Sequence, residues 1–261
     1  MFKLEIASRT DTGRVRERNE DCILVREDLK LFIVADGMGG HKRGDVASRV
    51  CVESISEFMD SPEKFIKGEI PPKKELKEKG IISTKEFNLL MAIQFANSRI
   101  FQMSYYNATL RGMGTTLVGA LFYNYNLFIT HVGDSRLYRL RNGRLSQLTY
   151  DHSLVNEYIR QGLLTNSEAR DFPHKNVIMK AIGLKNIVEV EYRRKKLKEG
   201  DMYLLCSDGL TDMLPDEEIE KILKSEKTPG KAADRFVAAA NEKGGYDNIS
   251  VIVLKIKGAS Q

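Results

Sequence analysis

Four aspartates stand beside strand-like runs of apolar residues, where their carboxylates could gather and bind a cation. Asp36 follows LFIVA, Asp134 follows LFITHVG, Asp208 follows MYLLCS, and Asp247 precedes NISVIVLKI. Three of them adjoin a glycine, which lets a backbone carbonyl or a bound ion approach closely. Like charges in one cleft repel, and hard divalent cations relieve that repulsion through oxygen ligands. A single Asp-Gly pair is usually only a turn, but the repeated pattern indicates magnesium or manganese rather than zinc.

Composition limits the kind of protein to which these acids belong. The chain has 261 residues, of which 42% are hydrophobic and only six are prolines, so it can bury a substantial core. A net charge of +5, spread along the chain, gives little support to nucleic-acid binding. The three cysteines lack metal-type spacing, which indicates reduced thiols, and we expect the cytoplasm. No segment approaches the roughly 18 apolar residues that span a bilayer, so we expect no membrane partner.

Helices are predicted between the strands that carry the acids. After the strand LFIVAD, helical spacing of apolar residues predicts a helix over 44–60 with Asp45 as its cap. Residues 62–83 are lysine-rich, contain two adjacent prolines and show no sustained period, which predicts a surface connection. A second helix is expected after Ser83 or Thr84. Thr228-Pro229 opens a later helix that Gly244 can close.

Hairpin signals indicate antiparallel sheets. TTLVGALFYN and LFITHVGD are two apolar runs joined by a short polar turn, and Asn142-Gly143 favours a type I′ turn between two alternating segments. DMYLLCSDG and DNISVIVLKIK are further strands. Antiparallel strands with inserted helices predict an α+β fold.

Seven segments in order resemble the metal-dependent type 2C protein serine/threonine phosphatases (the PPM family) in their compact bacterial form. They are RERNED (16–21), VADGMGGH (34–41), GMGTTLV (112–118), HVGDSRLY (131–138), DHSLV (151–155), CSDGLTD (206–212) and DNISVIV (247–253). The resemblance implies a four-layer α-β-β-α sandwich, with two central antiparallel sheets flanked by helices and a metal site at one end. It also implies one catalytic domain over 1–261, with a flap subdomain at about 151–183.

The resemblance implies roles for the acids. Asp36 would bridge two Mn²⁺ or Mg²⁺ ions, the Gly37 carbonyl would ligate one, and Asp208 and Asp247 would complete the other. Asp134 would hold a weaker third ion together with Asp208. In the first acidic motif, Glu20 and Asp21 would act through metal-bound water or support the ligands.

The resemblance identifies a residue that would bind phosphate, but it does not identify the residue that would protonate the leaving group. Arg16 matches the family's phosphate-binding arginine, and its guanidinium fork suits a phosphoryl group. Animal members carry a histidine directly after the Asp-Gly pair, where this chain has Met38. The general acid is therefore unassigned. His41 could protonate the leaving group, orient a metal-bound water, or only support the turn.

We expect the chain to hydrolyse phosphoserine and phosphothreonine on proteins. Two divalent ions about 3.5–4 Å apart lower the pKa of a bridging water and orient it for in-line attack on phosphorus. Catalysis would then depend on Arg16, Asp36, Asp208 and Asp247, without a covalent phosphoenzyme. Two alternatives remain: a non-catalytic module that binds phosphorylated proteins, and a two-metal nuclease. The retained acids and Arg16 disfavour the first, and the lack of a basic face interleaved with aromatic residues disfavours the second.

The remaining expectations concern partners and polar residues outside the cluster. The resemblance implies phosphorylated proteins as substrates, an opposing bacterial-type serine/threonine kinase and a monomeric chain. His131 lies inside an apolar strand and is predicted to be a core histidine with its ring satisfied. The basic run 193–196 is predicted to be a solvated strand edge. In the flap, Thr165 and Glu168 are predicted to cap a second short helix, while His152, Arg170 and His174 could contact substrate or support local structure.

Overall fold

Two antiparallel sheets form the centre of the molecule in the computed structural model, which describes residues 2–39, 43–66, 71–165, 168, 172 and 177–258. One, the β11 sheet, has the strand order β1 (Lys3–Asp11), β11 (Ile249–Lys257), β10 (Met202–Cys206), β7 (Arg136–Arg141) and β8 (Arg144–Gln147). The other, the β3 sheet, has the order β2 (Asp21–Arg26), β3 (Leu31–Met38), β5 (Leu117–Tyr123), β6 (Asn126–Val132) and β9 (Glu191–Lys196). A two-residue strand, β4 (Gly114–Thr115), pairs with β3.

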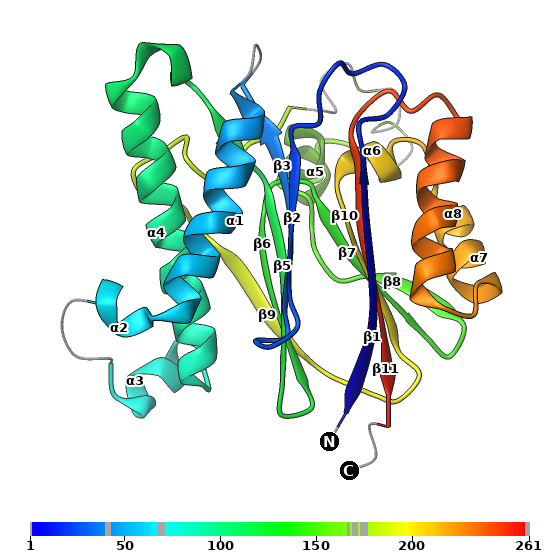
Figure 1. Cartoon of the computed structure of the whole chain (residues 1–261), viewed down its shortest axis with the longest axis horizontal. Helices are drawn as coiled ribbons and strands as arrows, with labels where there is room; N and C mark the ends of the chain where they lie inside the picture. Colours follow the sequence, from blue (N-terminus) through cyan, green and yellow to red (C-terminus); the bar gives the residue numbers. More distant parts are fainter. Residues whose placement is uncertain are drawn as a thin grey trace.

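Helices cover the outer face of each sheet (Figure 1). The long helices α1 (Gly44–Asp60) and α4 (Thr84–Tyr106) pack on the β3 sheet, while α7 (Asp216–Ser225) and α8 (Pro229–Glu242) pack on the β11 sheet. The shorter helices are α2 (Pro62–Phe65), α3 (Lys73–Glu78), α5 (Leu154–Arg160), α6 (Asp208–Thr211) and the 3-10 turn η1 (Ala108–Leu110). The predicted four-layer α-β-β-α sandwich is confirmed.

The apolar runs are long because both faces of the central strands are buried. In β3, Leu31, Ile33 and Ala35 pack with the helices, whereas Phe32 and Val34 face the other sheet. Successive strand residues point to opposite faces, so a strand buried on both sides reads as an unbroken apolar run. This is why LFIVA shows no alternation with polar residues.

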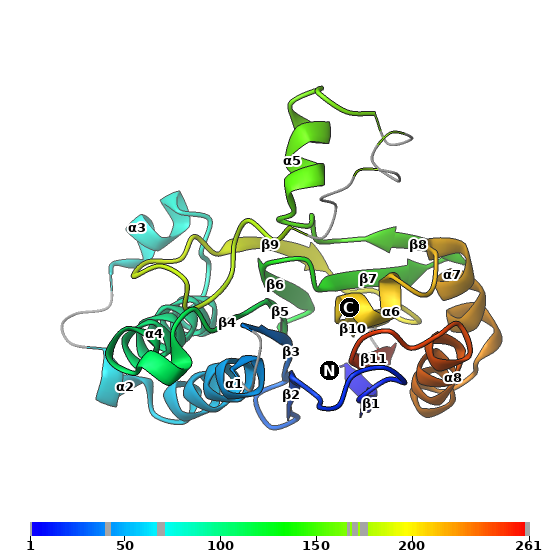
Figure 2. The same ribbon diagram turned by 90° about the horizontal axis from the view of Figure 1, so that it is seen from above.

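The strand ends next to the predicted site residues meet at one end of the sandwich. The ends of β3, β6 and β10 and the start of β11 lie at the top of Figure 1, whereas both chain termini lie at the bottom. Viewed from above, α5 stands off beyond the sheets on the side of β9 and β8 (Figure 2).

Local predictions about turns and caps are largely confirmed. Ser83 caps α4 by accepting a hydrogen bond from the Glu86 N–H, and the Thr228 side chain caps α8. Asn142 and Gly143 both have positive φ and join β7 to β8, as a type I′ turn requires. Thr165 and Glu168 make the reciprocal contacts of a capping box, while the rest of the second short helix that they are predicted to cap lies outside the described residues.

Two local predictions are wrong. Asp45 lies within the first turn of α1, which begins at Gly44, and so it is not the cap. The 62–83 segment is not only a connection, because it forms α2 and α3 and buries Leu76 and Ile81. Leu76 stands alone among charged residues, and Ile81 follows a glycine with only one apolar neighbour, so no periodic signal predicts their burial. Within the described residues, no helix is long and apolar enough to cross a membrane.

Candidate active site

Asp36 is held in place through its backbone. It lies near the end of β3, directly opposite Asp21 at the start of β2. Its N–H donates to the Thr116 hydroxyl at 3.1 Å, and its carbonyl accepts from the Thr116 N–H at 2.8 Å and the Thr115 hydroxyl at 2.9 Å. These contacts fix the main chain at the strand end and leave the carboxylate to other partners.

The β11 sheet and the β6–β7 turn contribute the other acids. Asp208 is the first residue of α6, two residues after the end of β10, and Asp247 stands two residues before β11. A Cβ atom on Gly209 would lie 2.0 Å from the Asn248 carbonyl oxygen, so only glycine lets the turn after β10 pack this closely against the start of β11. Asp134 follows β6. Segments far apart in the sequence thus deliver carboxylates to the same end of the sandwich.

The pKa values of these carboxylates are raised by burial first and by their acidic neighbours second. Loss of surrounding water, and then the charges of Asp21, Asp208 and Asp134, raise the pKa of Asp36 well above its usual range. Burial and the neighbouring acids raise the pKa of Asp134 to about 8, that of Asp21 to about 7 and that of Asp208 to about 6. Carboxylates that resist ionisation together form a site that a multivalent cation would stabilise.

The oxygens of the cluster suit hard cations. Among the described residues, one buried carboxylate oxygen each of Asp21, Asp134 and Asp208 has no hydrogen-bond partner. A Cβ atom on Gly44 would lie 2.5 Å from the Gly37 carbonyl oxygen, so the helix start leaves no room for a side chain there. Unpartnered carboxylate oxygens are the donors that Mg²⁺ and Mn²⁺ prefer, and the residues of the cluster therefore fit such ions.

Arg16 reaches the edge of this cluster from the loop between β1 and β2. Its Nη2 lies 2.7 Å from Oδ2 of Asp247. Asn248 anchors the loop, because its side-chain amide donates to the carbonyls of Thr12 and Arg18 at 2.9 and 2.8 Å. Its Oδ1 accepts from the Glu20 N–H at 2.8 Å. The asparagine beside one predicted ligand thus holds the loop that carries Arg16 and Glu20.

The sequence model described as "Protein phosphatase 2C" matches residues 13–240. The chain belongs to this family. It is 41% identical over 250 residues to the serine/threonine phosphatase stp of Listeria monocytogenes serotype 4b (strain F2365), covering 95% of this chain and 94% of that protein. It matches the crystal structure of the Mycobacterium tuberculosis serine/threonine phosphatase PstP/Ppp with a TM-score of 0.83 and 34% identity, covering 97% and 99% of the two chains. The catalytic domain of PstP in complex with two manganese ions matches with a TM-score of 0.81 and 34% identity, covering 98% and 100%.

Family membership makes the chain a metal-dependent protein serine/threonine phosphatase, as its sequence segments predict. The two alternative functions are not favoured. The structure brings together the ends of the segments that carry Asp36, Asp134, Asp208 and Asp247. Asp21 lies opposite Asp36, and the charges of Asp208 and Asp247 act on its carboxyl. Glu20 lies at its edge, where burial and the charge of Asp45 raise the pKa of its carboxyl. His41 lies outside the described residues, as do Arg170 and His174.

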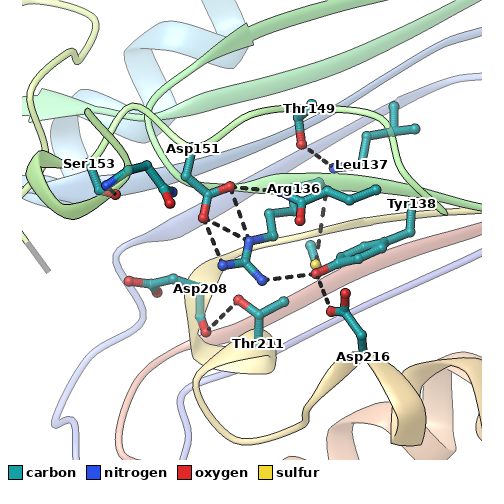
Figure 3. Close-up of polar contacts among 12 residues, drawn as sticks. Arg136, Leu137, Tyr138, Thr149, Asp151, Ser153, Asp208, Thr211 and Asp216 are labelled. Atoms are coloured by element: carbon teal, nitrogen blue, oxygen red, sulfur yellow. Dashed lines mark hydrogen bonds and ion pairs between the residues drawn. The ribbon is translucent and has the colours of Figure 1, made fainter. Parts of the chain in front are cut away.

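A buried polar network behind Asp208 was not predicted. Arg136 holds the Asp151 carboxylate through Nε at 2.9 Å and Nη2 at 2.7 Å, and its Nη1 donates to the Tyr138 hydroxyl (Figure 3). The Tyr138 hydroxyl donates to Asp216 at 2.9 Å. The network joins β7, the first residue of the predicted flap and α7 of the phosphatase. The segments that resemble the family contain Arg136, Tyr138 and Asp151. The sequence therefore marked these residues as part of the family pattern, but it did not indicate which side chains they contact.

Two further predictions hold only in part. His131 is a buried core histidine, as predicted, but within the described residues its ring nitrogens make no well-aligned hydrogen bond. The basic run is exposed at Arg193, Lys195 and Lys196, as predicted. Arg194 is only partly exposed, because its Nε and Nη2 contact the fully buried Glu86 at 2.6 and 2.7 Å. This contact joins β9 to α4, which are distant in the sequence.

Proposed function

We propose that this phosphatase hydrolyses phosphoserine and phosphothreonine on proteins at the carboxylate cluster, with Mn²⁺ or Mg²⁺ held by Asp36, the Gly37 carbonyl, Asp208 and Asp247. Asp134 and Asp208 hold a weaker third ion. The observation that carries the assignment is the set of unpartnered, buried carboxylate oxygens, in a cluster whose pKa values are raised by burial and then by the neighbouring acids. The manganese complex of the PstP catalytic domain supports the choice of metal.

The bound ions supply neutralisation of phosphoryl charge and an activated water at neutral pH. The chain's own residues position the substrate. The Arg16 guanidinium holds two phosphoryl oxygens through its planar fork, and the loop that Asn248 anchors sets its reach. Asp21 accepts a hydrogen bond from the Ser207 hydroxyl at 2.8 Å and so keeps the turn before Asp208 against β2. Glu20 orients solvent at the edge of the cluster.

A cysteine nucleophile is disfavoured by the state of the thiols. Cys51 and Cys206 are buried, and loss of water raises the pKa of both thiols and that of Cys22. A thiol with a raised pKa is rarely a thiolate at neutral pH and is a poor nucleophile. Direct transfer of the phosphoryl group to water therefore remains the proposed chemistry.

The proposal includes a wider context. Residues 1–261 form one catalytic domain, with the flap at about 151–183 beside the cleft. The phosphatase acts as a monomer and opposes a serine/threonine kinase that modifies the same proteins. The resemblance to compact bacterial phosphatases supports these points. Light scattering tests the monomer, and phosphoproteomics of cells lacking the protein identifies the substrates.

Hydrolysis of an aryl phosphate with manganese, with and without chelator, tests the proposed activity. We expect turnover that chelator removes and that the Asp36→Asn variant lacks. A peptide carrying phosphoserine or phosphothreonine should be dephosphorylated as well. Cleavage of an aryl phosphodiester in preference to the monoester would instead support a nuclease, and binding of the phosphopeptide without turnover would support a non-catalytic module.

A further inference from the structure

Two histidines and a glutamate meet beside the start of the predicted flap. His131 on β6 and Glu191 on β9 are directly opposite in the strand register, so their side chains share one face of the β3 sheet. His152 follows Asp151 in the chain, and its ring centroid lies 4.6 Å from that of His131. One potential ligand atom from each of the three residues lies within 4.8 Å of the others. A divalent ion could be bound by all three after a small closure.

The ring of His131 is buried and available to bind a metal ion. Its side chain is only 2% exposed, and within the described residues neither ring nitrogen makes a well-aligned hydrogen bond. The nearby backbone of Gly133 and Ser135 offers only weak contacts, which raise the pKa of the ring less than burial lowers it. Burying such a group without a partner costs free energy, so an unpartnered pair of nitrogens needs an explanation. Burial, and then the neighbouring His152, lower the pKa of His131 to about 3, which leaves a free lone pair at neutral pH.

His152 and Glu191 already have the spacing of two ligands on one ion. The His152 Nε2 lies 3.1 Å from the Glu191 carboxylate, and two ligands at about 2 Å on a tetrahedral ion lie about 3.3 Å apart. Both residues line a cavity of about 580 Å³ between the start of the flap and β9. The cavity provides an entry path and space for a fourth ligand.

We propose that His131, His152 and Glu191 form a second metal site, which binds a borderline divalent cation of the zinc type and leaves one position open to the cavity. Two imidazoles and one carboxylate suit Zn²⁺ or Co²⁺, whereas the all-oxygen cluster at Asp36 suits Mg²⁺ or Mn²⁺. The two sites therefore differ in donor type as well as in position.

Binding at this site would act on the catalytic cluster through Gly133. The Gly133 N–H donates to Nδ1 of His152 at 3.1 Å, so the proton of the neutral ring is on Nε2. An ion bound at Nε2 takes the place of that proton, so the neutral ring must carry its proton on Nδ1 instead. A protonated Nδ1 cannot accept the hydrogen bond from the Gly133 N–H, and this bond is then lost. Gly133, with φ of 107°, directly precedes Asp134. Filling the site should therefore lower turnover, a consequence that rests on the proposed function.

Cobalt absorption tests the site without relying on catalysis. The full chain is first saturated with Mg²⁺ to occupy the all-oxygen cluster and is then titrated with Co²⁺. Nitrogen-containing four-coordinate cobalt absorbs visible light far more strongly than cobalt surrounded by six oxygens. We expect one equivalent of this strong band in the wild type, bleached by Zn²⁺. Its absence, or its persistence in His131→Leu, would overturn the site.

Glu191→Gln and Glu189→Gln are the matched variants. Glu189 lines the same cavity but pairs with Lys180 at 2.6 Å and lies outside the cluster. Loss of a direct ligand should weaken Co²⁺ binding by about 100-fold or more, since even supporting contacts are worth 10–100-fold. Glu189→Gln should bind as the wild type does. Equal affinities for the two variants would contradict the assignment, and this comparison does not depend on the folding of His131→Leu.

The effect on turnover is measured separately, in manganese-saturated phosphatase with an aryl phosphate. Zn²⁺ at the concentration that fills the histidine site should lower kcat in the wild type and Glu189→Gln but not in His131→Leu. Equal inhibition of all three would place the inhibition at the carboxylate cluster and overturn the coupling through Gly133. If no variant hydrolysed the substrate, the proposed function would fail, while the cobalt titration would still report on the site.

Discussion

The guanidinium of Arg16 contacts the carboxylate of Asp247 at 2.7 Å, so the residue predicted to bind phosphate pairs with a residue predicted to bind metal. The side chains are 54% and 36% exposed. An ion pair this exposed contributes only about 0–1 kcal/mol, so the arginine can exchange the carboxylate for a phosphoryl group at little cost. If Asp247 binds a cation as proposed, the ion would compete with Arg16 for the carboxylate, and the guanidinium should then be available to the substrate.

Replacing Arg16 should affect substrate binding more than metal binding. Arg16→Ala is expected to raise KM by a factor equivalent to about 1.5–3 kcal/mol, the value of a lost charge-assisted hydrogen bond. Arg16→Lys should recover only part of this loss, because an ammonium lacks the planar fork. Steady-state kinetics and manganese titration of both variants provide the measurement. Arg18→Ala, in the same loop, is the control, and an unchanged KM in Arg16→Ala would end the phosphate-binding assignment.

Neutralising one carboxylate of the cluster should abolish activity without unfolding the protein. Asp36→Asn and Asp208→Asn each remove a proposed ligand charge and also relieve repulsion from neighbouring acids. We expect no detectable hydrolysis at saturating manganese and a melting temperature in chelator equal to or above that of the wild type. Hydrolysis by Asp36→Asn at the wild-type rate would remove Asp36 from the bridging role.

The metal-free protein should lose stability as pH rises. Burial raises the pKa values of Asp208, Asp21 and Asp134 to about 6, 7 and 8, above the ordinary value of 3.8. Between about pH 4 and 8 the folded state therefore binds more protons than the unfolded state, and its stability falls through this window. Melting temperatures in chelator from pH 5 to 8 should show the fall, and saturating manganese should suppress it. A chelated protein whose stability rose with pH would contradict the clustering of these acids.

Asp134 should matter for turnover more than for tight metal binding. As a ligand of a weak third ion, its removal in Asp134→Ala should leave two tight ions bound and reduce kcat strongly. Calorimetric titration with manganese counts the tight ions, and kinetics on the same protein gives kcat. If the tight ions were lost instead, Asp134 would belong to the core pair of metal sites.

Arg194 should stabilise the fold by neutralising Glu86. Glu86 is fully buried and also accepts from the Ile82 N–H and the Tyr123 hydroxyl. Arg194→Ala leaves this carboxylate without its cation, which should lower the free energy of unfolding by about 3 kcal/mol. Denaturant unfolding measures the loss. Arg193→Ala, its more exposed neighbour, should change stability by less than about 0.5 kcal/mol, and equal effects would contradict the buried pair.

Much of the secondary structure could be predicted because its causes are local. The β7–β8 turn follows from Asn142-Gly143, whose residues tolerate positive φ, and α4 and α8 begin where Ser83 and Thr228 can cap them. The short helices between α1 and α4 could not be predicted in this way. In this segment, burial of Leu76 on α3 and of Ile81 just after it depends on packing against the rest of the molecule.

The strands, the turns and the acids at the strand ends could be predicted from the sequence alone, because apolar runs and residue-specific backbone preferences act over a few residues. Which charged and polar groups meet depends on the complete fold. Arg16 reaches Asp247 across 231 positions, Arg194 reaches Glu86 across 108, and His152 reaches Glu191 across 39. These pairings depend on strand register and on the packing of the two sheets, which bring distant segments within hydrogen-bond distance. Because the type of a side chain does not specify which residue it will contact, such contacts are known only once the fold is known.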